Sequence, residues 1–302
     1  MPASPEDPGG DYGATIALPG IAGLAEHYDG FILDQWGVLH DGMHPYAGAR
    51  DCLERMRAAG KRVVMLSNSG RRQSTNVRFM QEMGFAPALF DAFVSAGEDA
   101  RSAIAHRATP FHARLGQRCF AFMRADDHEL LEGLPIELVT RVREADFLLV
   151  VAIDSTRKGL ADFEPDLQAA RELGLPMVCA NPDIFRFSAS GLVDAPGVIA
   201  RRYEQLGGDV FYHGKPHPAI YASCLDALAG CSRERVIAIG DSIEHDALGA
   251  ARAGLPCALV AGGVHIGALG AAWGRLPSPE AWRQFMRNAP ACPRYLVPAF
   301  VW

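Results

Sequence analysis

Four short stretches of the sequence place charged or hydroxyl side chains directly after an apolar run. The residues in question are Asp34 after "FIL", Ser67 after "VVML", Lys215 after "VFYHG", and Asp241 after "VIAIG" with Asp246 shortly beyond it. Side chains that follow parallel strands gather at one edge of the sheet, where α/β proteins bind their ligands. We therefore expect these side chains to form one site.

The residue types in this set suit phosphoryl transfer. Two carboxylates can hold Mg²⁺, which prefers a few carboxylates together with water and phosphate oxygens. A lysine neutralises the transferred group, while a hydroxyl and backbone amides bind its oxygens. A carboxylate such as Asp34 can also attack phosphorus and form an aspartyl phosphate, which splits a difficult hydrolysis into two easier steps.

Strand-like and helix-like segments alternate around these residues. The expected strands are 31–34, 62–66, 236–240 and 256–263, and the expected helices are 44–60, 73–84 and 244–254. Apolar runs that alternate with helices are typical of a parallel sheet buried on both faces. The sequence therefore predicts an α/β fold with a Rossmann-like core.

A second α/β block interrupts this pattern. Its expected strands are 118–123, 146–154 and 176–182, with a helix at 163–174. We therefore expect a core made of residues 19–100 and 195–302, with an inserted α/β cap domain at 101–194. Residues 1–18 are rich in Pro, Gly and acidic residues, so we expect a flexible N-terminus.

Composition and charge exclude several classes of protein. The net charge of −6 is spread with both signs interspersed, which argues against a nucleic-acid partner. The longest apolar stretches are about eight residues, too short to cross a membrane. No secretory signal is apparent, and the seven cysteines include no C-x-x-C pair, so we expect reduced thiols in a cytoplasmic protein.

Competing catalytic motifs fail on inspection. The stretch "GGDVFYHGKP" resembles a P-loop, but its glycines are misspaced and Pro216 stands where a hydroxyl must bind Mg²⁺. No G-x-G-x-x-G follows the first strand, and the G-x-S-x-G elbow of serine hydrolases is absent from the sequence.

At these residues the sequence resembles the haloacid dehalogenase superfamily, in particular its class IIA phosphatases, the relatives of NagD and pyridoxal-phosphate phosphatase. The motifs that carry the resemblance are "LDQWGVLHDG", "MLSNSGR", "GKPHP" and "GDSIEHDALGAARAG". They occur in the family's order, and the insert between the second and third occupies the position of the class IIA (C2-type) cap. The first motif matches a subgroup with the pattern Asp-x-Trp-Gly-Val-Leu.

The resemblance implies a Mg²⁺ site with named ligands. Asp34 would be both the nucleophile and a metal ligand, and the backbone carbonyl of Trp36 would be a second ligand. Asp241 would supply the second carboxylate. Asp246 would order the metal's water molecules or brace Lys215.

The resemblance also implies how the substrate is bound. Ser67, Asn68 and Ser69 would hold the phosphoryl oxygens, and Lys215 would pair with both Asp34 and the phosphate. The stretch "NPDIF" resembles the Asn-Pro-Asp turn of the cap, so the side chains expected to touch substrate there are Asn181 and Asp183. An Asn-Pro-Asp sequence is also simply a good turn, and this alternative stays open.

Trp36 departs from the family's pattern. Phosphatases of the family normally carry a second Asp at this position, which protonates the leaving oxygen and later activates water. An indole cannot do either, and a positioned acid or base is worth about 10²–10⁴ in rate. A leaving group of low pKa, substrate assistance or a histidine could compensate.

Histidine is the natural substitute because its pKa lies near neutrality. Four histidines lie close to the motifs, namely His40, His44, His213 and His217. We favour His40 and His217, which flank Asp34 and Lys215 in sequence. The alternative is that each is a solvated or packing histidine.

These observations predict a Mg²⁺-dependent phosphatase that acts on a small phosphorylated metabolite, such as a sugar, nucleotide or cofactor phosphate. Three alternatives remain: a ligand-binding or regulatory protein with weakened catalysis, a receiver-like phosphoacceptor, and a phosphotransferase to an acceptor other than water. The resemblance also implies a homodimer formed through the cap.

Overall fold

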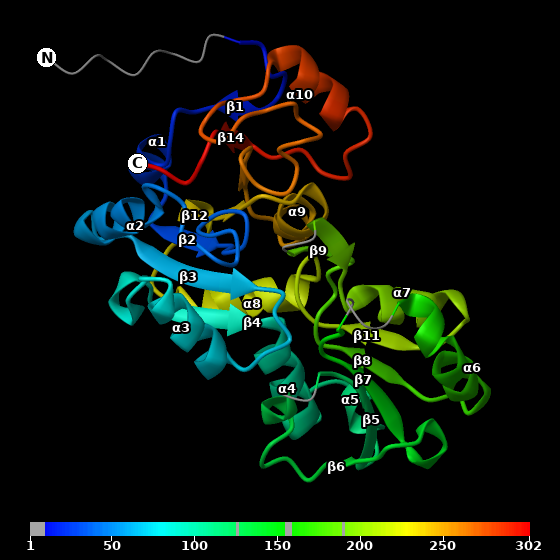
Figure 1. The fold of residues 1–302 in the computed structure, drawn as a ribbon. Coiled ribbons are helices and arrows are strands. Elements are labelled where there is room, and N and C mark those ends of the chain that lie inside the picture. The colour runs from blue at the N-terminus through cyan, green and yellow to red at the C-terminus, as the bar shows by residue number, and fades with distance from the viewer. Residues whose placement is uncertain (1–9, 125–126, 155–158, 189–190) are drawn as a thin grey trace, which may run out of the picture. The chain divides into compact units, whose positions relative to one another are not determined.

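The computed structural model describes residues 10–124, 127–154, 159–188 and 191–302, and it contains two compact units (Figure 1). The core unit comprises Met1–Ser67, Val77–Val94 and Lys215–Trp302. The inserted unit comprises Asn68–Asn76 and Ser95–Gly214.

The core unit is built on a seven-stranded sheet with the strand order β1-β14-β13-β12-β2-β3-β4. Its strands are β1 (Ile16–Ala17), β2 (Gly30–Leu33), β3 (Arg62–Ser67), β4 (Ala92–Ser95), β12 (Val236–Gly240), β13 (Cys257–Val260) and β14 (Tyr295–Val297). The central strand β2 pairs in parallel with both neighbours, so that Ile32 lies beside Ala238 and Val64. Parallel pairing brings the carboxyl ends of β2, β3 and β12 to one edge.

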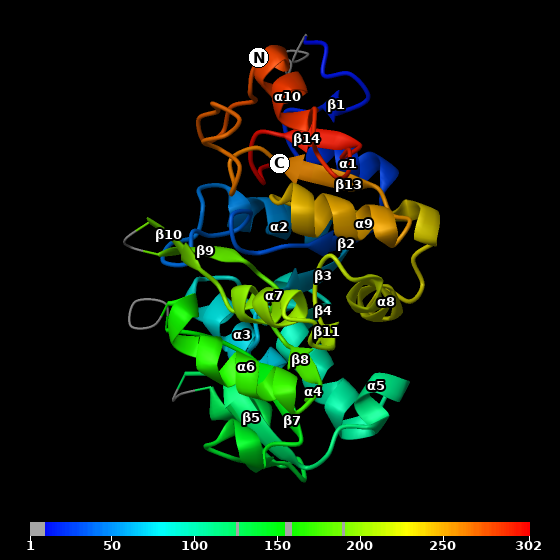
Figure 2. The same ribbon diagram turned by 90° about the vertical axis from the view of Figure 1, so that its right-hand side faces the viewer.

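Helices cover the sheet of the core unit. They are α1 (Ala22–His27), α2 (Ala49–Ala58), α3 (Gln73–Glu82), α8 (Pro218–Ala227), α9 (Leu248–Arg252) and α10 (Pro279–Met286), with a π-helical turn, η6 (Ile243–Ala247), before α9. Alternate strand residues such as Phe31 and Leu33 pack into one apolar cluster with Leu53 and Met56 of α2. Helix α8 contacts β3 and α9 (Figure 2). The complete burial of β2 is therefore the burial expected of a central parallel strand.

The N-terminal segment is more ordered than the sequence indicates. Ile16 and Ala17 form the edge strand β1, which pairs in parallel with Tyr295 and Leu296 of β14. Composition alone suggested a flexible segment through residue 18, and this is wrong for Ile16 and Ala17. Their partners lie nearly the whole chain away, and local sequence carries no signal of that pairing. Residues 1–9 lie outside the described residues.

The inserted unit has its own parallel sheet in the order β11-β8-β7-β5-β6. Its strands are β5 (Arg118–Phe122), β6 (Glu137–Leu138), β7 (Phe147–Val150), β8 (Met177–Cys179) and β11 (Val210–Tyr212), and an antiparallel hairpin is formed by β9 (Phe185–Ser188) and β10 (Gly191–Asp194). Its helices are α4 (Ala96–His106), α5 (Pro110–Ala113), α6 (Glu164–Glu172) and α7 (Gly197–Gln205). Across the described ranges of the whole chain, no helix is both long and apolar enough to span a membrane.

The division between the units differs from the boundaries expected from sequence. Residues 68–76, 95–100 and 195–214, all expected in the core, belong to the inserted unit. For residues 195–214 the reason is strand pairing: β11 adds to β8, with Phe211 beside Val178. The confirmed part of the prediction is the fold class, an α/β protein with parallel sheets.

The inserted unit contains a buried chain of hydrogen bonds through two histidines. His213 Nδ1 lies 2.6 Å from Asp99 Oδ2, His112 Nε2 lies 3.1 Å from His213 Nε2, and Thr109 Oγ1 lies 2.7 Å from His112 Nδ1. Because a carboxylate oxygen accepts, His213 Nδ1–H donates to Asp99, while the donors of the other two contacts depend on the tautomers of the rings. A proton added to His112 would keep these contacts, because Thr109 Oγ1 can accept as well as donate, so burial rather than a lost hydrogen bond disfavours the charged ring.

The burial of His112 predicts that acid destabilises the inserted unit. Burial, with the neighbouring His213, lowers the pKa of His112 from 6.5 to about 4. As the pH falls from 6.5 towards 4, His112 binds a proton in the unfolded polypeptide but stays neutral in the folded unit. The free energy of unfolding therefore decreases over this range. We expect the urea midpoint, followed by far-UV circular dichroism, to fall more from pH 7.5 to 5.5 in the wild type than in His112→Gln. Parallel falls in the two proteins would contradict the prediction.

Candidate active site

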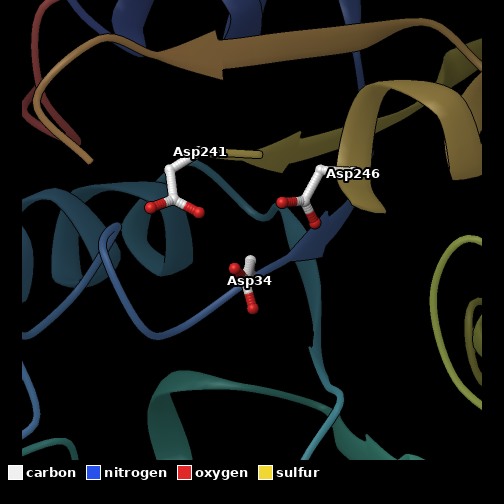
Figure 3. Close-up of side chains that lie close together, drawn as sticks. All are labelled: Asp34, Asp241 and Asp246. Atoms are coloured by element: carbon white, nitrogen blue, oxygen red, sulfur yellow. The ribbon is translucent and has the colours of Figure 1, made fainter. Parts of the chain in front are cut away.

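Three carboxylates from the core unit meet at the carboxyl edge of its sheet. Asp34 follows β2, Asp241 follows β12, and Asp246 comes from the turn η6 (Figure 3). One oxygen from each lies within 4.8 Å of the others, and all three residues are largely buried. Oxygen ligands at this spacing could hold a hard divalent cation. The strand-end rule therefore correctly predicted that these three residues come together.

Lys215 joins two of these carboxylates. Its ammonium Nζ lies 2.8 Å from Asp34 Oδ1 and 2.8 Å from Asp246 Oδ1, and its side chain is almost fully buried. Although burial alone would lower the pKa of Lys215, Asp246 and Asp34 raise it above its ordinary value. The lysine is therefore a fixed positive charge that orients Asp34.

The three carboxylates outnumber the one ammonium that joins them. Burial raises the pKa of Asp34 to about 7, against the lowering effect of Lys215. Burial, together with Asp34 and Asp246, also raises the pKa of Asp241 well above its usual range. A divalent cation among the three would favour their ionised forms, since it supplies the missing positive charge.

Backbone amides fix the directions of the two later carboxylates. Val264 N–H donates to Asp241 Oδ2 at 2.7 Å, and Ser242 N–H donates to Asp246 Oδ2 at 3.1 Å. Sequence reasoning missed the Val264 amide. The signal was the Gly262-Gly263 pair at the end of the expected strand 256–263, since small residues at a strand end permit close backbone approach.

The remaining phosphate-binding candidates fall on both sides of the division between units. Ser67 ends β3 in the core unit, whereas Asn68 and Ser69 belong to the inserted unit. Within the inserted unit, Asn68 Nδ2 donates to Asp183 Oδ1 at 2.7 Å, and Asp183 N–H donates to Asn181 Oδ1 at 3.1 Å. The structure thus brings Asn68 and the Asn-Pro-Asp turn together. Their shared contact with a substrate stays a prediction.

The histidines near the motifs occupy different surroundings. His40 is 2% exposed, and burial lowers its pKa to about 4. His44 is exposed beside Asp41, and His217 is half-buried directly before α8. His213 lies in the buried chain of the inserted unit described above. The burial and low pKa of His40 favour packing over proton transfer.

Comparison with known proteins identifies the family. A sequence profile of haloacid dehalogenase-like hydrolases matches residues 31–137, and a HAD-hydrolase-like profile matches residues 212–279. The crystal structure of a hydrolase of the haloacid dehalogenase-like family from Brucella suis 1330 is 31% identical with a TM-score of 0.79, and the match covers 93% of this chain and 99% of that one. The chain therefore belongs to the haloacid dehalogenase-like hydrolase family, as the motifs indicated.

Two curated relatives are phosphatases. Dihydroxyacetone phosphatase of Corynebacterium glutamicum (strain R) is 34% identical over 92 residues, 30% of this chain and 33% of that protein. D-glycerol 3-phosphate phosphatase of Mycobacterium tuberculosis is 25% identical over 243 residues, 80% of this chain and 65% of that protein. The match thus spans one third of the length of the first relative and just under two thirds of the length of the second.

A more distant solved structure shares the fold. The p-nitrophenyl phosphatase from Archaeoglobus fulgidus is 22% identical with a TM-score of 0.67, and the match covers 90% of this chain and 97% of that one.

The close approach of Gly263 to Asp241 gives a test of the cation site. A Cβ at Gly263 would lie 2.2 Å from the Cβ of Asp241, so Gly263→Ala must displace the carboxylate. We expect Mg²⁺ affinity, measured by isothermal titration calorimetry, to fall about 10–100-fold, as it does when groups that orient a ligand are disturbed. Gly267→Ala is the control, because a Cβ there meets nothing within 4 Å. Equal affinities in the two variants would show that Asp241 does not hold the cation.

Proposed function

We propose that the protein is a Mg²⁺-dependent phosphatase that hydrolyses a small phosphorylated metabolite through an aspartyl phosphate on Asp34. The observation that carries this proposal is the buried cluster in which Lys215 holds Asp34 and Asp246 beside Asp241. Membership of a hydrolase family with phosphatases among its relatives supports the same chemistry.

Asp34 is the proposed nucleophile. Lys215 binds Oδ1 of its carboxylate, which fixes the orientation of the group and leaves a second oxygen to attack phosphorus. The same ammonium would attract the phosphoryl group and stabilise the charge that develops on its oxygens. Because Lys215 is nearly fully buried, its charge acts with little screening by water.

The proposed metal ion fits the donor set at this edge. Carboxylate oxygens of Asp34 and Asp241 and the backbone carbonyl of Trp36 would hold Mg²⁺, with Asp246 ordering its water molecules. These are the hard oxygen ligands that Mg²⁺ prefers. When bound, the ion would neutralise negative charge on the phosphoryl group.

The remaining polar residues of the motifs would bind substrate. Ser67, Asn68 and Ser69 are the proposed ligands of the phosphoryl oxygens, and Asn181 and Asp183 are the proposed contacts from the inserted unit. The hydrogen bond between Asn68 and Asp183 supports a joint function, since it ties the second motif to the Asn-Pro-Asp turn.

Trp36 favours one competing function, a ligand-binding protein with weakened catalysis. Its indole cannot protonate a leaving oxygen, so a phosphorylated ligand could bind without efficient turnover. Tight binding of a phosphorylated ligand in the presence of Mg²⁺, without phosphate release, would favour this function over the phosphatase.

The phosphatase proposal predicts that turnover depends on Asp34. Phosphate release from a panel of sugar, nucleotide and cofactor phosphates should require Mg²⁺ and should fall by about 10³-fold or more in Asp34→Asn, because the covalent route is lost. Asp51→Asn is the control, since Asp51 is an exposed residue of α2 that forms a surface ion pair with Arg55 on the same helix. Equal rates in the wild type and Asp34→Asn would overturn the proposal.

A further inference from the structure

The loop after Asp34 exposes an aromatic side chain. Gln35 is buried, whereas the side chain of Trp36 remains 40% exposed. The residue that follows, Gly37, lies so close to Asp241 that a Cβ there would stand 1.8 Å from its Oδ2. The backbone of this loop therefore lies against the cluster, between Asp34 and the Gly37–Asp241 contact, while a large part of the Trp36 indole stays accessible.

The indole is held in place by its own loop. Gly42 has a φ of +94°, and a Cβ on it would lie 2.3 Å from an atom of the Trp36 ring. The missing side chain of Gly42 thus makes room for the indole to lie flat against the backbone. Such close packing makes the indole a fixed surface.

His40 braces the same surface from within. Its ring makes edge-type contacts with Trp36, at a centroid distance of 5.9 Å, and with Phe79, at 5.5 Å. Its Nδ1 accepts the Gly42 N–H at 3.0 Å, so the ring is hydrogen-bonded to the backbone that carries the indole. His40 is therefore a positioning residue for Trp36.

The charged groups of the cluster around Asp34 are already engaged, whereas two buried nitrogens of the loop, Gln35 Nε2 and His40 Nε2, have no hydrogen-bond partner among the described residues. Lys215 is bound by two carboxylates, and Asp246 accepts from Lys215 and from the Ser242 amide. Asp241 accepts the Val264 amide. Two residues after Asp34 the exposed side chain is an indole, which has no useful acidity.

We propose that Trp36 restricts the site to phosphate esters with a planar, weakly basic leaving group, namely aryl or enol phosphates; this rests on the phosphatase function proposed above. The exposed indole face stacks on the planar group, and such contacts between aromatic rings favour offset or edge arrangements. A leaving oxygen that is stable as an anion needs no proton donor.

The reaction balances without an acid at position 36. Asp34 forms a bond to phosphorus, the bond from phosphorus to the leaving oxygen breaks, and the leaving group departs as an anion that solvent then protonates. Water next adds to phosphorus, and Asp34 leaves as a carboxylate. Inorganic phosphate is released with both protons of that water.

The test compares leaving groups. We expect wild-type kcat/KM for 4-nitrophenyl phosphate to exceed that for glycerol 3-phosphate by about 10²-fold or more, the usual worth of a missing general acid. Across substituted phenyl phosphates, log kcat/KM should fall steeply as the leaving group becomes more basic. The same slope should persist in Trp36→Phe, which keeps an aromatic face.

Two matched pairs of variants distinguish the effect of a proton donor at position 36 from the effect of the aromatic face of Trp36. Trp36→Asp should reduce the ratio of kcat/KM for 4-nitrophenyl phosphate to kcat/KM for glycerol 3-phosphate by about 10-fold or more. Trp36→Asn, which introduces a side chain of the same size as Asp but without an acid, should leave this ratio unchanged. Trp36→Ala should raise KM for aryl phosphates more than Trp36→Phe does, and circular dichroism would verify that each variant is folded.

The outcomes distinguish this proposal from the one it rests on. Asp34-dependent turnover with similar wild-type kcat/KM for alkyl and aryl phosphates would overturn the restriction and leave the phosphatase function standing. This result needs no variant of Trp36, so misfolding cannot obscure it. The absence of Asp34-dependent turnover of any substrate would overturn the phosphatase function, and the restriction with it.

Discussion

The site depends on one buried interaction, the contact of Lys215 with Asp34 and Asp246. Both contacts measure 2.8 Å, and all three groups are withdrawn from water. Taking charges out of water costs several kcal/mol for each ion, and only good geometry offsets that cost. The sheet supplies this geometry, because β2 and β12 run in parallel and end at the same edge. The turn η6 then returns Asp246 to the cluster.

The same interaction leaves a charge imbalance that is useful for chemistry. The cluster holds three carboxylates and one ammonium, which contacts only Asp34 and Asp246, so further positive charge would complete it. A divalent cation meets this requirement and would also attract a phosphate dianion to Asp34. Trp36, on the loop whose backbone lies against the cluster, adds neither charge nor a proton. The charged groups of the site thus lie at the edge of the sheet, while the preference for a leaving group is proposed to come from Trp36 in the loop after Asp34.

The parts of the site that follow from strand ends could be predicted from the sequence. Asp34 and Asp241 each end an apolar run, and parallel strands that end at one edge bring such residues together. Lys215 and Asp246 were assigned to the same site because they follow the apolar runs "VFYHG" and "VIAIG", and the resemblance to the family added only their roles. The supporting Val264 amide could not be assigned from residue type, because every residue but proline has such a donor. The helix expected at 244–254 begins as a π turn, η6, and Asp246 lies on that turn.

The pairing of strands that lie far apart in the sequence could not be predicted from local sequence patterns. Strand β1 pairs with β14, and β11 joins the sheet of the inserted unit, through contacts that neither segment signals by itself. The buried histidines have the same origin. The residue type of His40 and its short separation from Asp34 in sequence favoured a proton donor, but its surroundings exclude water and lower its pKa. Burial determines whether a histidine can exchange a proton near neutral pH, and the burial of a polar residue is difficult to predict from sequence.

The central claim is that Asp34 carries the phosphoryl group during turnover. The direct measurement is rapid acid quenching of the working enzyme, followed by borohydride reduction and mass spectrometry of the peptide that contains Asp34. Borohydride reduces an acyl phosphate to an alcohol, so the structure predicts homoserine at position 34, formed only when both substrate and Mg²⁺ are present. Unmodified Asp34 in an enzyme that is releasing phosphate at its full rate, under conditions in which a reference acyl phosphate is fully reduced, would contradict the claim.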